Sequence, residues 1–327
     1  MDSEFIFDTA PYPQAHAATL AETDQGLAAA WFAGSREGRS DVTIWFSRRE
    51  DQTWRPPQRV ATGVMARGVR YPCWNPVLFQ VPNGPLLLFY KVGPSPSRWW
   101  GMIKRSHDAG KTWSEPEKLP DSILGPIKNK PVLRDDGVLL CPSSCERAGW
   151  RVHMEYTPDF GKTWHRGEPL NDRRSFTAIQ PSLIAHANGL MQVVCRTRQG
   201  VISECWSEDG GMTWSAMRAT NLPNPDSGVD AVTLRDGRAL LVYNHTTFAR
   251  SPLNLALSDD GLHWHAAHVL ESQPGEYSYP CVIEGADGQI HIAYTWKRTR
   301  IRYCTLRPDQ LETEPMDHGV WPDPPES

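Results

Sequence analysis

Five tryptophans close similar short phrases at nearly even intervals along the chain. Trp54, Trp113, Trp164, Trp214 and Trp264 are separated by 59, 51, 50 and 50 residues. A repeat of about 50 residues is typical of β-propellers, in which each repeat supplies one small sheet of a ring. The spacing therefore predicts a repeat architecture that occupies most of the 327 residues.

The phrases share the pattern S-x-D-x-G-x-T-W, which is typical of a tight hairpin turn. Asp and Ser accept hydrogen bonds from nearby backbone N–H groups, Gly adopts positive φ, and Trp offers a large ring that packs between neighbouring sheets. The match is complete at 106–113 and 207–214, has Thr for Ser at 157–164, is one residue short at 258–264, and lacks Asp and Gly at 47–54. This chemistry favours a structural role for the phrases over a catalytic one.

Between the phrases, the sequence predicts short apolar strands separated by turns that contain Gly. The predicted units span 14–54, 72–113, 125–164, 178–214, 227–264 and, without a closing phrase, 277–306. The last unit needs a further strand, for which residues 4–7 are the natural donor, because a closed ring has no exposed sheet edge. We thus predict an all-β fold, a six-bladed β-propeller over residues 1–306 as one domain, with an acidic, Pro-rich tail at 307–327.

Composition narrows the classes of partner. The net charge of −4, without any Lys/Arg run interleaved with aromatics, argues against nucleic acid and favours small molecules or glycans. The seven cysteines have neither zinc-site nor disulfide spacing, and most lie in apolar runs, so we expect them to be reduced and buried. We expect no metal and no cofactor. The N-terminus does not resemble a signal peptide and no stretch is long enough to span a membrane, which predicts a cytoplasmic protein.

The candidate functional residues stand at the ends of the predicted inner strands, because a propeller gathers these ends around one axial funnel. Cations and amides recur there at equivalent points of several units, where a purely structural ring needs no charge. These polar positions are His16, Arg36, Glu37, Arg39, Asp41, Arg70, Asn75, Lys91, Lys128, Asn129, Lys130, Glu146, Gln180, Arg196, Arg198, Asp230, Asn244, His245, Arg250, Tyr277, Tyr279, Trp296 and Arg298.

With these phrases in this order, the chain resembles the sialidase (neuraminidase) superfamily of Asp-box propellers over nearly its whole length. The segments that carry the resemblance, besides the boxes, are Asn75-Pro76-Val77, 125–131, Gln180-Pro181-Ser182-Leu183, Val194-Cys195-Arg196, Arg250 before 253–258, and Glu276-Tyr277-Ser278. More narrowly, it is similar to bacterial proteins described as predicted neuraminidases.

The resemblance implies a role for several residues. Arg196 and Arg250 would clamp a substrate carboxylate, and Tyr277 would be the nucleophile, because a neutral tyrosine is not repelled by that carboxylate as a carboxylate nucleophile would be. Asp41 or Glu37 would protonate the leaving oxygen. Further substrate contacts are predicted from Arg36, Asn75, Lys128, Lys130, Asp230 and His245.

Two positions depart from the family pattern. His16 stands roughly where the first arginine of the carboxylate-binding triad is expected, and Gln180 stands where a Glu would polarise the tyrosine. An amide does not accept a proton at neutral pH, so another base is needed, with His16 or His245 as the substitutes. The residues therefore predict the family's propeller scaffold, whereas the two departures leave the reaction itself open.

Three functions follow from these residues. We favour an exo-acting glycoside hydrolase that removes a terminal acidic or deoxy sugar from an oligosaccharide or glycoconjugate. The second is a polysaccharide lyase that acts on uronic acids by β-elimination, with His16, Tyr277, Arg196 and Lys128 as its set. The third is a glycan-binding propeller without catalysis. The sugar, the linkage and the oligomeric state do not follow from the sequence.

Overall fold

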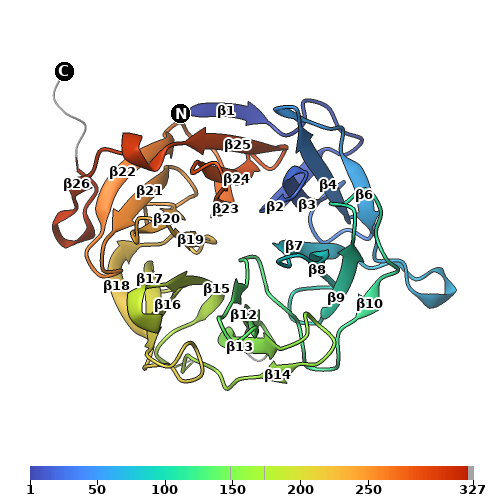
Figure 1. Cartoon of the computed structure of the whole chain (residues 1–327), viewed down its shortest axis with the longest axis horizontal. Helices are drawn as coiled ribbons and strands as arrows, with labels where there is room; N and C mark the ends of the chain where they lie inside the picture. The colour runs from blue at the N-terminus through green and yellow to red at the C-terminus, as the bar shows by residue number, and fades with distance from the viewer. Residues whose placement is uncertain (148, 173, 323–327) are drawn as a thin grey trace.

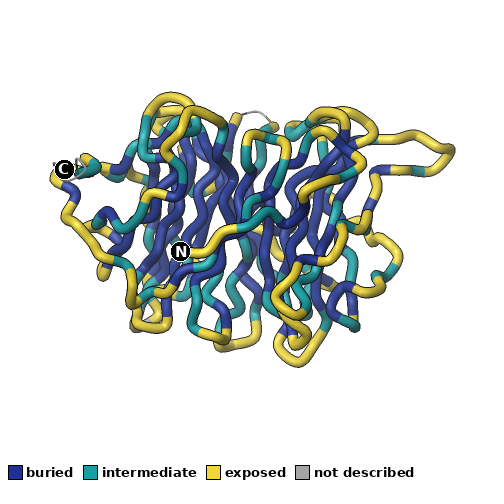
Figure 2. The backbone as a smooth tube through the Cα atoms, turned by 90° about the horizontal axis from the view of Figure 1, so that it is seen from above, coloured by how far each residue is buried: buried dark blue, intermediate teal, exposed yellow. Residues whose placement is uncertain are grey.

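Six antiparallel sheets surround one axis in the computed structural model, which describes residues 1–147, 149–172 and 174–322 (Figure 1). The chain passes once around the ring, and each sheet is one blade whose strands follow one another outward from the axis. The prediction of a six-bladed β-propeller is confirmed. Figure 2, which is turned by 90° from Figure 1, shows that the strands are buried and that the connecting loops on both faces of the ring are exposed.

Blades one to three use the chain from residue 14 to residue 166. Blade one contains β2 (Gln14–Thr23), β3 (Gly26–Gly34), β4 (Thr43–Glu50), β5 (Thr53–Trp54) and β6 (Gln58–Ala61). Blade two contains β7 (Cys73–Gln80), β8 (Leu86–Val92), β9 (Trp100–Ser106) and β10 (Glu117–Lys118). Blade three contains β11 (Val132–Leu133), β12 (Leu139–Cys145), β13 (Arg151–Thr157) and β14 (His165–Arg166).

Blades four to six use the remainder of the chain together with its first residues. Blade four contains β15 (Ala178–Ala185), β16 (Met191–Thr197), β17 (Val201–Ser207) and β18 (Arg218–Pro223). Blade five contains β19 (Asp230–Thr233), β20 (Ala239–Tyr243), β21 (Leu253–Ser258), β22 (His265–Glu271) and β26 (Glu314–Pro315). Blade six contains β23 (Tyr277–Glu284), β24 (Ile290–Trp296), β25 (Arg300–Leu306) and β1 (Asp2–Phe5).

The remaining regular elements among the described residues are four short 3₁₀ helices in the connections. They are η1 (Ala66–Gly68), η2 (Ala187–Gly189), η3 (Pro308–Gln310) and η4 (Asp317–Gly319).

The first strand of the chain closes the ring. β1 pairs antiparallel with β25, with Glu4 opposite Tyr303, and the Ile6 amide continues the pairing to the carbonyl of Ile301 at 3.0 Å. The closing strand was predicted at residues 4–7. It is observed at Asp2–Phe5, and Ile6 and the residue after it turn into the core between blades six and one. Closure satisfies the outer edge of blade six, which would otherwise be open to pairing with another chain.

The tryptophan phrases form the turns that were predicted from their chemistry. In the second one, the Asp108 carboxylate accepts hydrogen bonds from the Thr112 amide at 2.8 Å and its hydroxyl at 2.6 Å, and Ser106 Oγ accepts from the Gly110 amide at 2.7 Å. Gly110 has φ of +88°, and a Cβ there would lie 2.2 Å from the ring of Phe46 in blade one. These bonds lower the pKa of Asp108 to about 2. Each turn thus stabilises its own blade with local bonds.

The C-terminal segment lies against blade five. β26 pairs with β22, and Met316 is buried in the apolar cluster between blades four and five. The Trp321 amide donates to His245 Nε2 at 3.1 Å. Residues from 314 to 321 therefore extend the outer side of blade five instead of leaving the ring directly after residue 306.

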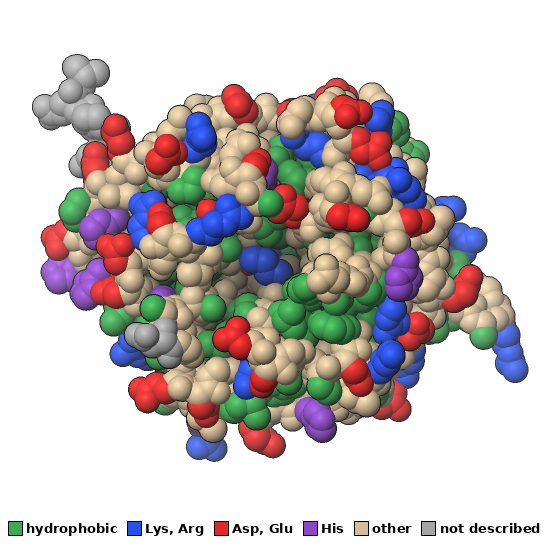
Figure 3. Space-filling view, viewed as in Figure 1, with side chains coloured by type: hydrophobic (Ala, Val, Ile, Leu, Met, Phe, Trp, Pro, Cys, Tyr) green, Lys and Arg blue, Asp and Glu red, His purple; other side chains and the backbone are tan. Residues whose placement is uncertain are grey.

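The space-filling view shows one face of the ring hollowed around the axis. Basic and hydrophobic side chains lie inside this hollow, and acidic side chains stand at its edge (Figure 3). The innermost strands β2, β7, β11, β15, β19 and β23 surround the axis and all begin at the same end of the ring. Side chains that precede or open these strands therefore converge at that end.

Candidate active site

A bulge near the start of four inner strands turns one side chain toward the axis. Pairing with the second strand breaks between residues 16 and 19, 74 and 77, 179 and 182, and 278 and 281. A bulge re-aims a side chain, and a left-handed residue makes the bend. The left-handed residues at the four bulges are Ala17 (φ 58°), Asn75 (φ 38°), Gln180 (φ 55°) and Tyr279 (φ 52°).

Three of these residues precede proline, at Pro76, Pro181 and Pro280. Proline has no N–H to offer to the sheet, so a break in the ladder costs less at this point than elsewhere. A non-glycine residue in the left-handed region costs about 1–3 kcal/mol and persists where the surrounding structure enforces it. The repeated strain marks this end of the axis as the candidate functional site.

Tyr279 lies at the centre of the site. Its hydroxyl accepts hydrogen bonds from Arg196 Nη1 at 2.7 Å and from Gln180 Nε2 at 3.2 Å. The same Arg196 nitrogen donates to Gln180 Oε1 at 3.2 Å, which fixes the orientation of the amide. The phenol oxygen thus has two N–H donors, and its own proton is directed toward neither. Arg196 thus places a positive charge 2.7 Å from this oxygen.

Tyr277, the predicted nucleophile, lies elsewhere. Its ring is buried in the apolar cluster between blades five and six, and its amide donates to the carbonyl of Arg250 at 2.9 Å. In a regular strand residues 277 and 279 would share one face. The left-handed backbone at Tyr279 breaks this alternation, so only Tyr279 turns to the axis. The placement of Tyr277 in the funnel is corrected to Tyr279.

His16, which was predicted near the axis, packs against Tyr279. The two ring centroids are 4.2 Å apart, and His16 Nδ1 lies 2.8 Å from Thr295 Oγ1, which also accepts from the Ala17 amide at 3.1 Å. Burial, and then the charges of Arg298 and three other cations, hold the pKa of His16 well below its ordinary value. His16 is therefore neutral near pH 7.

Hydrogen-bond counting favours one tautomer of His16. Thr295 is fully buried, and its hydroxyl already accepts from Ala17. If the hydroxyl donates to Nδ1, only the Nε2–H of His16 is without a partner among the described residues. If Nδ1 carries the proton instead, both the Thr295 hydroxyl proton and Nε2 are left unpaired. Each buried unpaired polar group costs about 1–3 kcal/mol, so we assign the proton to Nε2.

Three arginines and the carboxylates of Asp226 and Glu276 surround this pair. Arg196 Nε and Nη2 donate to Asp226 Oδ1 at 2.9 and 2.6 Å. Arg250 Nη1 donates to Glu276 Oε1 at 2.9 Å, and Arg298 Nε donates to the same oxygen at 2.8 Å. Arg196 is almost buried, whereas the carboxylates of Asp226 and Glu276 are 40% and 31% exposed. The carboxylates that bind the guanidinium groups thus lie on the solvent side of the site.

The two predicted acids differ in their surroundings. Asp41 accepts from the Ser35 amide at 2.7 Å and the Ser35 hydroxyl at 2.8 Å. These bonds, acting against partial burial, keep the pKa of Asp41 below its ordinary value. Glu37 instead pairs with Arg298 and lines a small cavity beside His16. Of the two carboxylates, only Glu37 contacts the arginine cluster. Arg36 lies next to it, on the cavity wall that also includes Arg298.

Another carboxyl group meets the cluster from blade three. Glu146 follows β12, is partly buried, and lies beside Trp150 and Arg196. Burial raises the pKa of Glu146, although the charge of Arg196 and a hydrogen bond from Trp150 oppose the shift. The guanidinium groups of Arg196 and Arg198 stack on the Trp150 ring, at 5.1 and 4.0 Å from its centroid.

The floor of the site is a buried network that joins four blades. Lys128 Nζ donates to Asn129 Oδ1, to the Val229 carbonyl and to the Pro280 carbonyl at 2.7, 2.7 and 2.5 Å. Burial, partly opposed by the charge of Asp230, lowers the pKa of Lys128 to about 8. All three ammonium protons have acceptors, so Lys128 closes the axis instead of offering a free charge.

Asp230 completes this floor. Its carboxylate accepts from Lys130 Nζ at 2.9 Å, from Ser182 Oγ at 2.8 Å and from the Val282 amide at 2.8 Å. Lys130 also donates to the Ala231 carbonyl at 2.8 Å. The predicted substrate contacts from Lys130 and Asp230 are therefore occupied by the protein itself.

His245 and Asn75, which were predicted to contact substrate, lie in different surroundings. The ring of His245 bonds to the Tyr243 hydroxyl and to the Trp321 amide, and burial lowers its pKa to about 4. It secures the C-terminal segment and lies away from Tyr279. Asn75 stays at its bulge and is buried, and no hydrogen bond to its side chain is found among the described residues.

Sequence reasoning listed Tyr279, Arg298 and Glu146 among the polar positions near the axis without giving them a role. It quoted Glu276 only within a family phrase and did not mention Asp226. The structure brings these five residues together. One signal was available for Tyr279: X-Pro follows the same point of the inner strand in Asn75-Pro76, Gln180-Pro181 and Tyr279-Pro280.

The described residues contain neither a candidate metal site nor a disulfide nor a membrane-spanning helix. No group of three or more His, Cys, Asp or Glu side chains suited to a metal ion is found among the described residues. All seven cysteines are free thiols, and six of them are buried. In the part of the chain that is described, no helix is long and apolar enough to cross a membrane.

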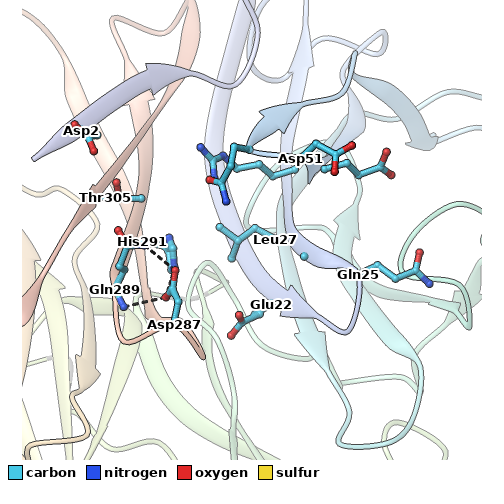
Figure 4. A pocket seen from close by; sticks show the side chains of 13 residues that line it. Asp2, Glu22, Gln25, Leu27, Asp51, Asp287, Gln289, His291 and Thr305 are labelled. Atoms are coloured by element: carbon cyan, nitrogen blue, oxygen red, sulfur yellow. Dashed lines mark hydrogen bonds and ion pairs between the residues drawn. The ribbon is translucent and has the colours of Figure 1, made fainter.

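A cavity of about 610 Å³ lies between blades six and one, formed by the β2–β3, β4–β5 and β23–β24 turns (Figure 4). These turns join the strand ends opposite to the arginine cluster. Glu22, Asp51 and Asp287 line it, and Asp287 contacts His291 at 3.3 Å. It is separate from the axial site.

The fold and the axial cluster define a sialidase-like β-propeller. The chain belongs to the family described as "BNR repeat-like domain", whose model matches residues 25–292. It is similar to the anhydrosialidase of Macrobdella decora, with 23% identity over 250 residues, which is 65% of this chain and 32% of that protein. The chain thus spans about a third of that relative's length.

Solved structures show the same fold at low identity. The Hadza microbial sialidase Hz136 superposes with a TM-score of 0.77 and 20% identity, over 91% of this chain and 66% of that one. The intramolecular trans-sialidase from Ruminococcus gnavus, in complex with oseltamivir carboxylate, superposes with a TM-score of 0.75 and 15% identity, over 95% and 98%.

Proposed function

We propose that the protein is an exo-acting glycoside hydrolase that removes a terminal acidic sugar from a glycan. The observation that carries the proposal is the tyrosine hydroxyl of Tyr279, which is held by Arg196 at 2.7 Å within a cluster of arginines. The relatives, which are named sialidases and anhydrosialidase, support a glycan as the substrate.

The electrostatics support an acidic sugar. Arg196, Arg250, Arg298 and Lys128 all act to lower the pKa of His16, so the potential at the centre is positive. A guanidinium has five N–H donors, and only two nitrogens each of Arg250 and Arg298 bond to described residues. Their other N–H groups are left for the sugar's carboxylate, and the Nε2–H of His16 adds a neutral donor.

The chemistry assigns Tyr279 as the nucleophile. A phenol does not repel the substrate carboxylate. As the Tyr279 oxygen bonds to the anomeric carbon, the bond from that carbon to the leaving oxygen breaks and the phenol proton passes to solvent, while Arg196 donates to the same tyrosine oxygen. Water then releases the sugar from the tyrosine. Gln180 donates to the same oxygen and holds the ring in place. We assign proton donation to the leaving oxygen to Glu146, because its raised pKa favours the protonated form that a general acid needs.

The closed floor supports exo action. Lys128 and Asp230 bridge the inner strands at the axis, so a glycan chain has no passage through the ring. The elimination alternative has less support, because Tyr277 lies in the core and the protons of Lys128 are engaged.

The test uses a panel of sialosides and uronic-acid-terminated oligosaccharides, with products read by mass spectrometry. We expect a free intact sugar from the wild-type chain and from Tyr277→Phe, and a loss of at least about 10³-fold in rate from Tyr279→Phe with binding retained. A product lighter by one water would establish elimination instead. Full activity in Tyr279→Phe would remove the tyrosine from the mechanism, and binding without any product would favour a non-catalytic propeller.

A further inference from the structure

A second cavity opens between blades two and three on the same side of the ring as the site. Its volume is about 610 Å³, and its walls come from the β8–β9 loop, the segment after β10 and the β12–β13 loop. β7 begins at the site end of the axis and β8 runs back to that end, so the β8–β9 loop lies on the site face. The β12–β13 loop carries Glu146 and meets Arg196.

This cavity adjoins a space that borders the axial site. A neighbouring space of about 550 Å³ is lined by Glu37, Arg298, Trp74 and Pro96. Pro96 also lines the cavity between blades two and three. A path from the arginine cluster past Glu37 and Trp74 therefore leads to the edge of this cavity at Pro96. We call the cavity between blades two and three the radial groove.

The radial groove carries an excess of positive charge. Four cations line it, Arg98, Lys118, Arg147 and Arg166, against one carboxylate, Asp121. In a chain with net charge −4 this clustering stands out.

Only part of this charge is neutralised by the protein. Lys118 pairs with Asp121 at 2.8 Å, and Arg166 Nη1 donates to the Ser122 carbonyl at 3.0 Å. Arg98 and Arg147 are exposed, and neither has an ion-pair partner among the described residues. Two guanidinium groups are thus available to a ligand that enters the groove, and guanidinium groups bind carboxylates and sulfate-like oxyanions with charge-assisted hydrogen bonds.

Aromatic side chains stand beside these cations. Trp99 and Trp100 are partly exposed and line the groove. The Trp74 and Trp99 rings pack edge to face at 5.9 Å, and Trp100 packs on Tyr71 in the same way at 5.4 Å. These contacts hold the indole rings in fixed positions, and a fixed aromatic ring offers an apolar surface to the C–H face of a sugar.

We propose that the radial groove is a second binding subsite, which holds the sugars on the leaving-group side of the bond and takes an oligosaccharide that bears carboxylate or sulfate groups. Its orientation as a leaving-group subsite rests on the proposed function, whereas its affinity for an anionic oligosaccharide does not. The groove then selects an acidic glycan chain in addition to the acidic terminal sugar.

Binding tests the subsite without any need for turnover. Three probes are titrated by calorimetry: tetragalacturonate, sulfated maltotetraose and neutral maltotetraose. We expect at least one anionic probe to bind more tightly than the neutral one, with an affinity that falls as salt rises. Which of the two binds distinguishes a uronic from a sulfated chain.

Variants locate the binding. The double variant Arg98→Ala/Arg147→Ala should weaken the anionic probe by about tenfold or more, since two charge-assisted contacts are lost. Arg307→Ala removes an exposed arginine elsewhere and should change nothing. Tyr279→Phe should bind the probe with wild-type affinity. The binding result therefore holds even if Tyr279 proves to have no role in catalysis. Equal affinity in wild type and double variant, or equal affinity for neutral and anionic probes, would overturn the proposal.

Discussion

The two faces of the ring use polar side chains in opposite ways. On the face of the tryptophan phrases, each Asp bonds to backbone amides four residues or fewer away, as Asp209 does with Thr213 at 2.8 Å. On the site face, polar groups bond across blades, as Asp230 does with Lys130 and the Val282 amide. A local turn survives the loss of its neighbours, whereas a cross-blade network depends on the whole ring. The site is thus built from the part of the molecule that only the complete fold can supply.

The largest difference between the faces should appear in stability. Asp230→Ala leaves Lys130 and the Val282 amide without their buried partner and should cost about 3–5 kcal/mol, as for other broken buried pairs. Asp209→Ala removes only local bonds at an exposed turn and should cost about 1–2 kcal/mol. Urea unfolding followed by tryptophan fluorescence compares the two.

Asp230→Asn is the control for that comparison, because it keeps the shape and loses only the charge. If Asp209→Ala proves as costly as Asp230→Ala, the cross-blade network does not hold the ring together. If Asp230→Ala fails to fold, the Asn variant should still fold and be measurably destabilised.

The second effect concerns acid catalysis on the site face. Because the pKa of Glu146 is raised, its protonated form persists to higher pH, and the wild-type rate should fall as pH rises through that pKa. Glu146→Gln should lose about 10²-fold or more in kcat and should lose that limb of the pH profile. Glu37→Gln should keep the limb. A pH profile that is unchanged in Glu146→Gln would return the acid to Glu37.

A smaller effect should appear on the opposite face in acid. Hydrogen bonds from Thr213 lower the pKa of Asp209 to about 2 from its ordinary value of 3.8. A depressed carboxyl pKa stabilises the fold above the unfolded value and loses that contribution as pH falls through the folded value. The unfolding midpoint should therefore drop between about pH 4 and pH 2, and Asp209→Asn should make the drop shallower. Identical slopes in both proteins would show that this turn does not contribute.

The smallest effect is expected at Asp41. Its carboxylate is engaged by Ser35 on the loop after β3, and its pKa is already below the ordinary value. Asp41→Asn should leave kcat/KM within about twofold of wild type, since it lies outside the arginine cluster. A loss of more than tenfold would restore Asp41 as the acid.

How far the sequence predicts the structure also differs between the faces. The spacing of Trp113, Trp164 and Trp214 predicts six blades because each phrase acts within its own turn, where local chemistry decides the conformation. The closing strand near Glu4 was predicted for a similar reason, since an unpaired edge requires a partner.

The site was harder to predict from the sequence, because its geometry depends on departures from regular strand geometry. Strand alternation treats residues 277 and 279 as equivalent, and the bulge at Tyr279 makes them different. Arg298 acquires its role from a turn that meets Glu276 and Glu37 in space. Whether Lys128 is free or engaged is decided by carbonyls from blades that lie far apart in sequence.

The pairing of β1 with β25 also bears on the order in which the molecule can be made. Asp2–Phe5 leave the ribosome long before their partner strand, Arg300–Leu306. Until then blade six has an open outer edge, and the first blade has no neighbour on one side. The ring therefore becomes a single cooperative unit only after blade six has been made, and removal of residues 1–5 should leave an exposed edge that pairs between molecules.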